Sequence, residues 1–328
     1  MDPSIKGIRN LKNTCYINSS LQLLSNIIPI STYLQEDNEF SHSSYCIFSI
    51  LSELKSIYCQ LFSSSSKTIN PKVFISQCFQ QFPQFPAYTQ QDSEEFLMAL
   101  IEKLDSELKS SPNLIKTTIE GCYSYKYTCK ACNHASQNTD YFRELNLQIP
   151  QDVPNINTLD SLMSEVEISI IAKQRPSFFE LFDLFSKEKA RINLYYCLFS
   201  YLFNSNTQKF CAFCNEVKDH SSNISMVKFP EYLIISLKRF KYRYWNRKIS
   251  ENVFMPNLLD FSKLMENGAQ YELQGVIEHT GFSFRGHYKA YILRSGEWWL
   301  CNDSKTRKCS FEEVFTSQAY ISLYKLAS

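Results

Sequence analysis

A cysteine, a histidine and an adjacent amide and carboxylate, far apart along the chain, have the types and the order that nucleophilic catalysis requires. Cys15 stands near the N-terminus, His287 follows Gly286 near the C-terminus, and Asn302 and Asp303 come shortly afterwards. A thiolate attacks a carbonyl group, an imidazole moves the proton, and a third polar group orients the imidazole. These residues predict a cysteine nucleophile with a histidine base. For the histidine alone, a structural role at a strand end is the simpler interpretation.

Cys15 lies where a helix is expected to begin, in the segment NLKNTCYINSSLQLL. Asn13 or Thr14 is placed to cap that helix. A helix N-terminus carries unpaired N–H groups and a partial positive charge, which favour the thiolate. The same N–H groups, with a side-chain amide from Asn10 or Asn13, can hold a developing oxyanion. The alternative is a buried, unreactive cysteine at an ordinary helix start, and the presence of a partner histidine argues against it.

Two C-x-x-C pairs form a second set of residues with chemistry: Cys129 with Cys132, and Cys211 with Cys214. Four thiolates make the tetrahedral site that structural zinc prefers, and such a site leaves no position for a catalytic water. Residues 133–210 separate the pairs, which is far longer than a compact zinc ribbon. One pair alone would also fit a redox motif. His134 and Cys197 are nearby bystanders that could substitute as ligands.

The composition excludes several classes of protein. The 328 residues carry 34 Lys and Arg against 33 Asp and Glu, which disfavours a duplex nucleic-acid reader. The N-terminus lacks an apolar stretch of signal-peptide length, and no run of about 18 apolar residues is present, so we expect no membrane span. Twelve cysteines in a chain of this size indicate nucleophiles or metal ligands rather than a disulfide framework. We therefore expect a reducing compartment, the cytoplasm or the nucleus.

The elements that must position these residues change character along the chain. The apolar spacing of Ile17, Leu21, Leu24 and Ile28 predicts an amphipathic helix that ends at Pro29. Helices are also expected over 43–62 and 91–108, with loops at the serine run 63–66 and around residues 83–86. After about residue 118 the segments are rich in strand-forming residues, and helical pieces are expected only at 159–172 and 178–189. The pattern predicts an α+β fold in one continuous unit.

At these motifs the chain resembles the ubiquitin-specific protease family of deubiquitinases. GIRNLKNTCYINSSLQ matches the cysteine box, and HTGFSFRGHYKAYI followed by WWLCNDS matches the histidine box. QQDSEEFL, LNLQIP and FPEYLIISLKRF lie between them in the family's order. The resemblance covers residues 7 to about 304. It implies a papain-like cysteine protease over residues 1–328, with a helical thumb to about residue 118 and a β-rich palm and zinc-ribbon-like fingers thereafter.

The resemblance also implies roles for individual residues. Cys15 is the nucleophile, His287 the base and acid, and Asn302 or Asp303 the group that orients the ring. Asn10 resembles the oxyanion-stabilising asparagine. The channel for ubiquitin's C-terminal tail is implied to be lined by Gln90, Asp92 and Glu95. The acidic residues also suit the first turn of a helix, and both roles are compatible.

Further implications concern the metal and the partners. The resemblance implies one structural zinc ion at the four cysteines, an insertion within residues 155–195, and ubiquitin or ubiquitinated proteins as substrates. An activating protein partner is compatible with it. Lys12 departs from the family pattern, which has glycine at this position. A glycine there usually permits an uncommon backbone conformation.

Three other functions compete with this interpretation. A catalytically weak pseudoenzyme could bind ubiquitin without cleaving it, although all catalytic residues are present. A protease for another ubiquitin-like modifier would need similar tail-channel residues. A zinc-stabilised nucleic-acid binder rests on the C-x-x-C pairs alone, and the single basic cluster, LKRFKYRYWNRK at 237–248, is expected to form a strand and a turn.

Overall fold

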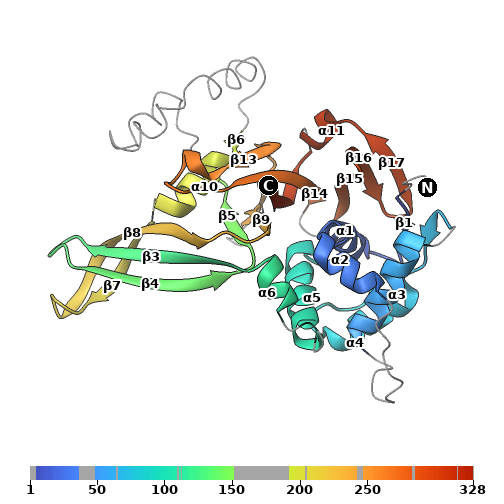
Figure 1. Ribbon diagram of the computed structural model, residues 1–328, viewed down its shortest axis with the longest axis horizontal. Helices are drawn as coiled ribbons and strands as arrows, with labels where there is room; N and C mark the ends of the chain where they lie inside the picture. Colours follow the sequence, from blue (N-terminus) through green and yellow to red (C-terminus); the bar gives the residue numbers. More distant parts are fainter. Residues whose placement is uncertain are drawn as a thin grey trace.

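The computed structural model describes residues 5–36, 49–63, 66–108, 111, 113–150, 192–203, 205–241, 247–282, 285–315 and 317–327. Figure 1 shows three parts: a group of helices, a twisted sheet above it, and a long narrow sheet that extends to the left. We call these parts the thumb, the palm and the fingers. The predicted insertion lies almost entirely outside the described residues, as do the helical pieces at 159–172 and 178–189.

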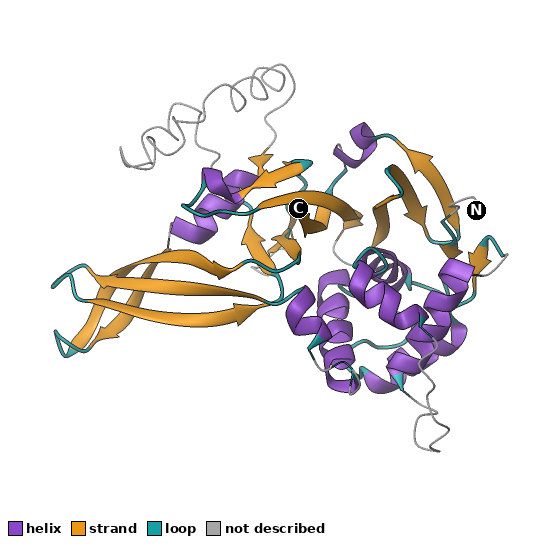
Figure 2. Cartoon of the chain, viewed as in Figure 1, coloured by secondary structure: helices purple, strands orange, loops and turns teal. Residues whose placement is uncertain are grey.

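The thumb contains the helices that precede residue 119, as the sequence predicts (Figure 2). They are α1 (Cys15–Leu24), α2 (Ile28–Gln35), α3 (Ile50–Ser63), α4 (Lys72–Gln81), α5 (Ser93–Glu107) and α6 (Leu114–Thr118). A short parallel pair, β1 (Gly7–Ile8) and β2 (Thr68–Ile69), lies beside them. The helix expected over 91–108 is confirmed, and the one expected over 43–62 is described only from Ile50.

The first helix ends earlier than the sequence predicts. α1 stops at Leu24, a tight turn follows, and Pro29 lies in the first turn of α2 rather than at the end of a helix. Proline is tolerated in a first turn because the N–H that it lacks would have no partner there. The Asn26 side chain donates to the carbonyls of Gln274 and Leu293 at 2.7 and 2.9 Å, which fastens the turn to the palm.

α1 is also buried on every side, whereas the sequence pattern predicted an amphipathic helix. All ten of its residues are buried, and it packs against α5 on one side and the palm strand β15 (Arg285–Arg294) on the other. Several of its polar side chains donate hydrogen bonds to backbone carbonyls: Ser20 to that of Tyr16 at 2.8 Å, and Gln22 to that of Lys6 at 2.8 Å. Buried polar groups without partners would cost stability.

The palm is an eight-stranded sheet in the order β17-β16-β15-β14-β18-β9-β5, with β13 paired to β14. All pairs are antiparallel except β5 with β9. The strands are β5 (Leu145–Gln148), β9 (Tyr232–Lys238), β13 (Leu258–Asp260), β14 (Gln270–Phe282), β15 (Arg285–Arg294), β16 (Glu297–Asn302), β17 (Lys305–Cys309) and β18 (Ala319–Leu326).

Both faces of the palm are covered, so its strands bury successive residues on opposite sides. On β14, Ile277 packs into the core shared with α1, while Val276 packs into a second core with Leu198 of α10 (Leu194–Phe203). This double burial holds α1 rigidly against the strands that carry the C-terminal motif. Within the described ranges, none of the helices combines the length and the apolar character needed to cross a membrane.

The fingers are a four-stranded antiparallel sheet in the order β4-β3-β8-β7. Its strands are β3 (Gly121–Cys129), β4 (Ala135–Phe142), β7 (Ser205–Cys211) and β8 (Glu216–Lys228). The remaining elements are β6 (Ile192–Asn193), β10 (Phe240–Lys241), β11 (Arg247–Lys248), β12 (Val253–Phe254), the 3₁₀ helix η1 (Phe261–Lys263) and α11 (Phe311–Phe315). In the basic cluster at 237–248, the described residues contribute the end of β9 and the antiparallel pair of β10 and β11, in agreement with the expected strand.

Candidate active site

Cys15 is the first residue of α1 and is only 3% exposed. Thr14 occupies the N-cap position, but the expected capping bond is absent: its hydroxyl accepts from Leu11 N at 2.9 Å instead. Asn13 does not cap the helix either, because its side-chain amide donates to the carbonyl of Tyr88 at 2.9 Å. The first turn of α1 therefore begins without a side-chain cap.

The loop before Cys15 adopts the backbone conformation that a glycine would favour. Lys12 and Asn13 have φ angles of 64° and 58°, in the left-handed region. Asparagine enters this region more readily than other residues with a Cβ, and lysine does so at a cost. The geometry of the loop is thus retained with lysine at position 12. The Lys12 amine lies 5.5 Å from the centre of the Tyr88 ring.

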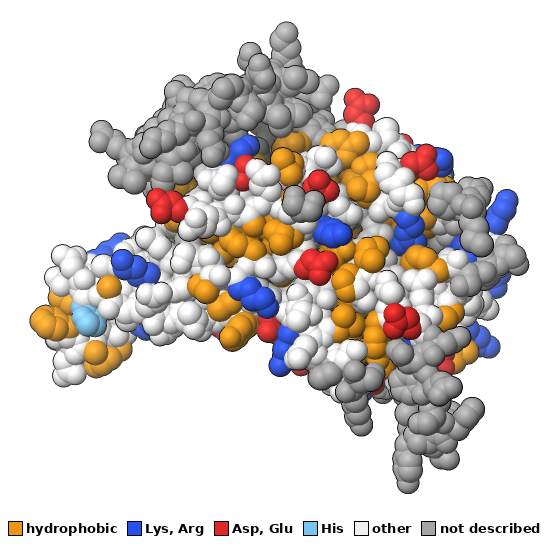
Figure 3. Space-filling view, viewed as in Figure 1, with side chains coloured by type: hydrophobic (Ala, Val, Ile, Leu, Met, Phe, Trp, Pro, Cys, Tyr) orange, Lys and Arg blue, Asp and Glu red, His pale blue; other side chains and the backbone are white. Residues whose placement is uncertain are grey.

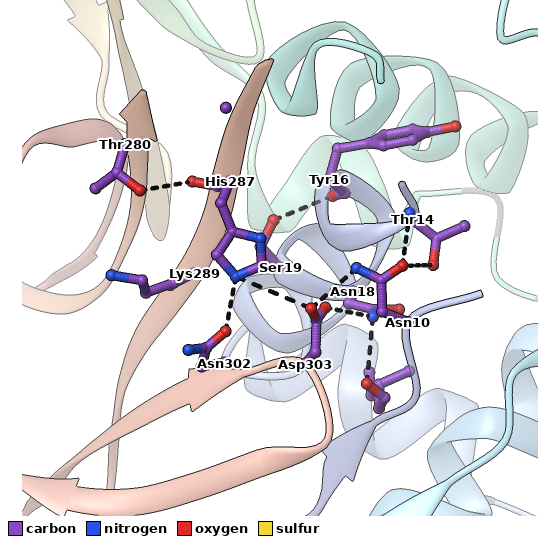
Figure 4. Close-up of polar contacts among 12 residues, drawn as sticks. Asn10, Thr14, Tyr16, Asn18, Ser19, Thr280, His287, Lys289, Asn302 and Asp303 are labelled. Carbon is purple, nitrogen blue, oxygen red and sulfur yellow. Dashed lines mark hydrogen bonds and ion pairs between the residues drawn. The ribbon is translucent and has the colours of Figure 1, made fainter. Parts of the chain in front are cut away.

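His287, on β15, lies between Cys15 and the end of β16. Its Nε2 is 2.7 Å from Asn302 Oδ1 and 3.9 Å from Asp303 Oδ2, so Asn302 is the nearer partner (Figure 4). The hydrogen bond with Cys15 is the main cause that raises the pKa of His287 from 6.5 to about 9. The bond with Asn302 and the charges of Cys15 and Asp303 act in the same direction, while burial opposes them. The structure thus brings Cys15, His287 and Asn302 together.

Asp303, next to Asn302, accepts hydrogen bonds from three other residues. Its carboxylate accepts from Asn10 Nδ2 at 2.9 Å and from Asn18 Nδ2 at 2.8 Å, and its carbonyl accepts from Ile8 N at 2.8 Å (Figure 4). Its φ of 50° lies in the left-handed region. Asp303 thereby joins the end of β16 to the loop and the helix that carry Cys15.

Asn18 is a site residue that the sequence analysis missed. It lies on the same face of α1 as Cys15, three residues later, and is 3% exposed. A polar residue three positions after Cys15, on the same face of the helix, was the available signal. The Asn10 amide also donates to Asp303, and its Oδ1 accepts from Thr14 N at 3.1 Å. Its role toward an oxyanion stays a prediction.

The three residues predicted to line the tail channel differ in their surroundings. Gln90 hydrogen-bonds with both backbone groups of Gly286. Asp92 caps α5 by accepting from Glu94 N at 2.8 Å and also accepts from the Tyr320 hydroxyl at 2.6 Å; burial raises its pKa. Glu95 is exposed in the first turn of α5. Contact of any of them with ubiquitin stays a prediction.

The two C-x-x-C pairs meet at the tip of the fingers. Cys129 Sγ lies 4.0 Å from Cys214 Sγ, Cys132 Sγ lies 3.6 Å from Cys211 Sγ, and all four sulfur atoms are within 4.8 Å of one another. The long separation in sequence is no obstacle because β3 pairs directly with β8. This cluster could hold a metal ion.

Each pair sits in a turn of the same form. Asn133 and Asn215 follow the second cysteine of their pairs, with φ angles of 59° and 56°. Each donates its backbone N–H to the first cysteine's carbonyl at 2.8 Å. The repeated sequence C-x-x-C-N was the signal for this shared turn. Cys197 is buried in the α10 core, away from the four sulfur atoms, and His134 stacks on Phe213 with ring centres 6.1 Å apart.

A cysteine at the start of a buried helix, near a histidine and an asparagine on a twisted sheet, is the arrangement of the papain-like class of cysteine hydrolases. The chain belongs to the ubiquitin carboxyl-terminal hydrolase family, whose sequence model matches residues 6–324.

Individual relatives agree with this assignment. The chain is 28% identical to human ubiquitin carboxyl-terminal hydrolase 2 over 99% of its own length and 55% of the relative's. It is 26% identical to ubiquitin carboxyl-terminal hydrolase 25 of Arabidopsis thaliana, over 96% of its length and 46% of the relative's. The chain therefore spans about half the length of these relatives.

Solved structures show the same fold. A SAGA DUB module of Ubp8, Sgf11, Sus1 and Sgf73 bound to monoubiquitin superposes with a TM-score of 0.74 at 22% identity, covering 100% of this chain and 71% of the matched chain. A second module of the same four proteins, bound to ubiquitin aldehyde, gives 0.73 at 23% identity, covering 99% and 70%. The expected thumb, palm and fingers architecture is confirmed.

Proposed function

We propose that this chain is a thiol-dependent deubiquitinase that hydrolyses the bond after the C-terminal glycine of ubiquitin. The observation that carries the proposal is the position of His287: its Nε2 is 2.7 Å from Asn302 Oδ1, and its interaction with Cys15 is the main cause of its raised pKa. Family membership supplies the substrate class. A thiol, an imidazole that it influences, and an amide bonded to that imidazole are the groups that acyl transfer needs.

The proposed reaction proceeds in two half-reactions. The Cys15 thiolate attacks the carbonyl carbon of the terminal glycine while donors near Asn10 and the start of α1 hold the oxyanion. The C–N bond breaks as protonated His287 gives its proton to the leaving amine, and a thioester remains on Cys15. His287 then accepts a proton from water as that water attacks the thioester, which releases ubiquitin's carboxylate and restores the thiolate and the imidazolium.

Ubiquitin's tail is proposed to approach along Gln90, Asp92 and Glu95. An extended basic tail is attracted by carboxylates at a channel mouth, and Glu95 is exposed there. The structural relatives named above are bound to monoubiquitin or ubiquitin aldehyde and to partner subunits. By that likeness we propose that this chain binds ubiquitin and acts on ubiquitinated proteins, and that it has an activating protein partner. We propose no role for nucleic acid or membrane.

The fingertip cysteines are proposed to hold one structural zinc ion. Zn–S bonds of about 2.3 Å in a tetrahedron place sulfur atoms about 3.8 Å apart. Two of the sulfur separations, 3.6 and 4.0 Å, bracket that value. Zinc, when bound, cross-links the two hairpin tips, and Cys129, Cys132, Cys211 and Cys214 fill its coordination. Because these ligands and Cys15 must all be reduced thiols, we place the protein in the cytoplasm or nucleus, which imaging of the tagged chain would test.

The proposal is tested with ubiquitin that carries a fluorogenic amide at its C-terminus. The wild-type chain should release the fluorophore, and Cys15→Ala should not, while it still binds ubiquitin. A folded wild-type chain without turnover would favour the pseudoenzyme. A panel of other ubiquitin-like modifiers with the same amide tests the alternative of a protease for another modifier. A higher kcat/KM for one of them than for ubiquitin would identify it as the substrate.

A further inference from the structure

The segment of residues 86–92, which we call the bridging segment, touches both halves of the catalytic site. At one end, the carbonyl of Tyr88 accepts from Nδ2 of Asn13, which stands two residues before Cys15, at 2.9 Å. At the other end, Gln90 bonds to Gly286, one residue before His287. The loop of the nucleophile and the strand of the base are therefore hydrogen-bonded to the same short stretch of chain.

Gln90 acts on Gly286 as a neighbouring strand would. Its Nε2 donates to the Gly286 carbonyl, and its Oε1 accepts from Gly286 N at 3.0 Å. The ladder between β15 and β16 starts only at Ala290, so β16 does not reach this residue. The side-chain amide supplies the two bonds that the missing strand cannot make.

Gly286 is confined on another side by a buried ring. A Cβ at this position would lie 1.9 Å from His279 Nε2, so the close approach requires glycine. His279 is 2% exposed and packs against Tyr288 with ring centres 4.5 Å apart. Between this ring and the Gln90 amide, Gly286 has little freedom, and neither does the backbone of His287.

The other end of the segment holds a strained residue. Tyr88 has a φ of 63°, a conformation that costs roughly 1–2 kcal/mol for a residue with a side chain. Such strain persists only where surrounding contacts hold it, and it is concentrated at functional sites. Besides the bond from Asn13, the Tyr88 ring packs on Phe79 with centres 5.8 Å apart.

We infer that Gln90 and Asn13 are positioning residues, and that the bridging segment sets the distance between Cys15 and His287. Packing of α1 on β15 brings the two halves together, and the bridging segment fixes the final register between them. This inference rests on the proposed function but adds a role for Gln90 that needs no contact with ubiquitin. A displacement of about 1 Å between reacting groups can cost a hundredfold in rate.

The test compares Gln90→Ala with Gln91→Ala. Gln91 is a matched control because, among the described residues, its side chain hydrogen-bonds only to Thr89 of the same segment. Two rates are measured: turnover of the ubiquitin amide, and alkylation of Cys15 by iodoacetamide at pH 7, followed on the Cys15 peptide by mass spectrometry. Iodoacetamide is too small to need the tail channel. Reactivity of the thiol depends on its proton acceptor.

Gln90→Ala should lower kcat about 10- to 100-fold with a small change in KM, and should slow alkylation of Cys15 as well. Gln91→Ala should resemble the wild type in both rates. A raised KM with unchanged alkylation would overturn the inference, because it would make Gln90 a contact for ubiquitin's tail only. Equal effects of the two variants would overturn it too.

Two further variants keep the test decisive. If Gln90→Ala does not fold, Gln90→Glu preserves the size and the acceptor for Gly286 N but loses the donor, and it should show the same loss to a smaller degree. Asn13→Ala combined with Gln90→Ala should lower kcat by less than the product of the single effects, because both act through one segment. Independent, multiplicative effects would contradict this. A wild-type chain that cleaves no ubiquitin would refute the proposed function, while the alkylation rates would still test the positioning role.

Discussion

The catalytic junction and the tip of the fingers are stabilised in opposite ways. At the junction every residue of α1 is buried, and the site is held by side-chain amides that bond to groups far away in sequence, such as Asn10 and Asn18 on Asp303. At the tip, apolar side chains gather at the surface (Figure 3); Phe213 is 74% exposed and Val217 63%. We therefore expect the sheet tip, whose apolar side chains are exposed, to depend on its four cysteines, and the junction to depend on packing and hydrogen bonds. A mutation in one of these regions should then leave the structure of the other unchanged.

The largest effects are expected at the junction. There, Asp303→Ala should mainly lower stability, whereas Asn302→Ala should mainly lower kcat. Asp303→Ala removes the acceptor of Asn10 and Asn18 and should lower the free energy of unfolding by about 2–4 kcal/mol, because two donors lose their partner. Asn302→Ala removes one bond to the His287 ring and should lower kcat about 10- to 100-fold with little loss of stability. Urea unfolding and kinetics of both variants separate the roles. Equal stability of the two proteins would contradict this account of Asp303.

Cys211→Ser at the fingertip should have a smaller effect than the junction variants, and that effect should be on KM. Loss of one thiolate should release the metal, because structural zinc sites need all their ligands, and should raise the KM for the ubiquitin amide about tenfold, equivalent to roughly 1.4 kcal/mol. The kcat should change much less, since the chemistry lies at the other region. Metal content per chain and steady-state kinetics measure this. Cys59→Ser, on the thumb helix α3, is the control and should keep the metal. A fall in kcat without a rise in KM would contradict the expectation that the fingertip and the catalytic junction act separately.

The pH dependence of the wild-type enzyme tests the bond between His287 and Cys15. The pKa of His287 is raised from 6.5 to about 9, chiefly by that bond. A raised pKa stabilises the folded state fully below pH 6.5 and loses this contribution as the pH rises through about 9. In the proposed mechanism protonated His287 is also the donor to the leaving amine, so the rate should fall about tenfold per pH unit above that pKa.

The matching measurement is a pH–rate profile of the ubiquitin amide in the wild type and in Asn302→Ala. The variant should lose rate at a lower pH, because the Asn302 bond is one cause of the raised pKa of His287. A wild-type alkaline limb near pH 6.5 would mean that the histidine titrates without the influence of Cys15.

The smallest effect is expected at Lys12. Lys12→Gly relieves a left-handed backbone at a φ of 64° and should raise the free energy of unfolding by about 0.5–1 kcal/mol. Lys12→Ala removes the same side chain but keeps the strain, so it should not stabilise the protein. Urea unfolding of both variants measures the difference. If alanine stabilised as much as glycine, the lysine side chain rather than the backbone would be responsible.

The sequence was most informative where a residue type and its spacing determine the chemistry. Cys15, His287 and Asn302 were predicted from their order and from the family motifs, and the C-x-x-C pairs from the ligand preference of zinc. The α+β order was also readable, because strand-forming residues replace helical patterning after about residue 118.

Contacts between distant segments were not readable. Asn18 looks like any polar residue of a helix until the fold places Asp303 against it, and Gln90 pairs with Gly286 only because β16 stops short of it. The end of α1 was predicted wrongly for the same reason. The Asn26 side chain fastens the turn to the palm backbone, a tertiary contact that overrides local helical spacing.

The central claim, that Cys15 is the nucleophile, is tested most directly with ubiquitin carrying an electrophile at its C-terminus. The wild-type chain, whose sequence has twelve cysteines, should gain one ubiquitin, and peptide mass spectrometry should place it on Cys15. His287→Ala should react far more slowly, because the thiol then lacks its proton acceptor. Attachment to any other cysteine, or a folded wild-type chain that does not react, would contradict the account.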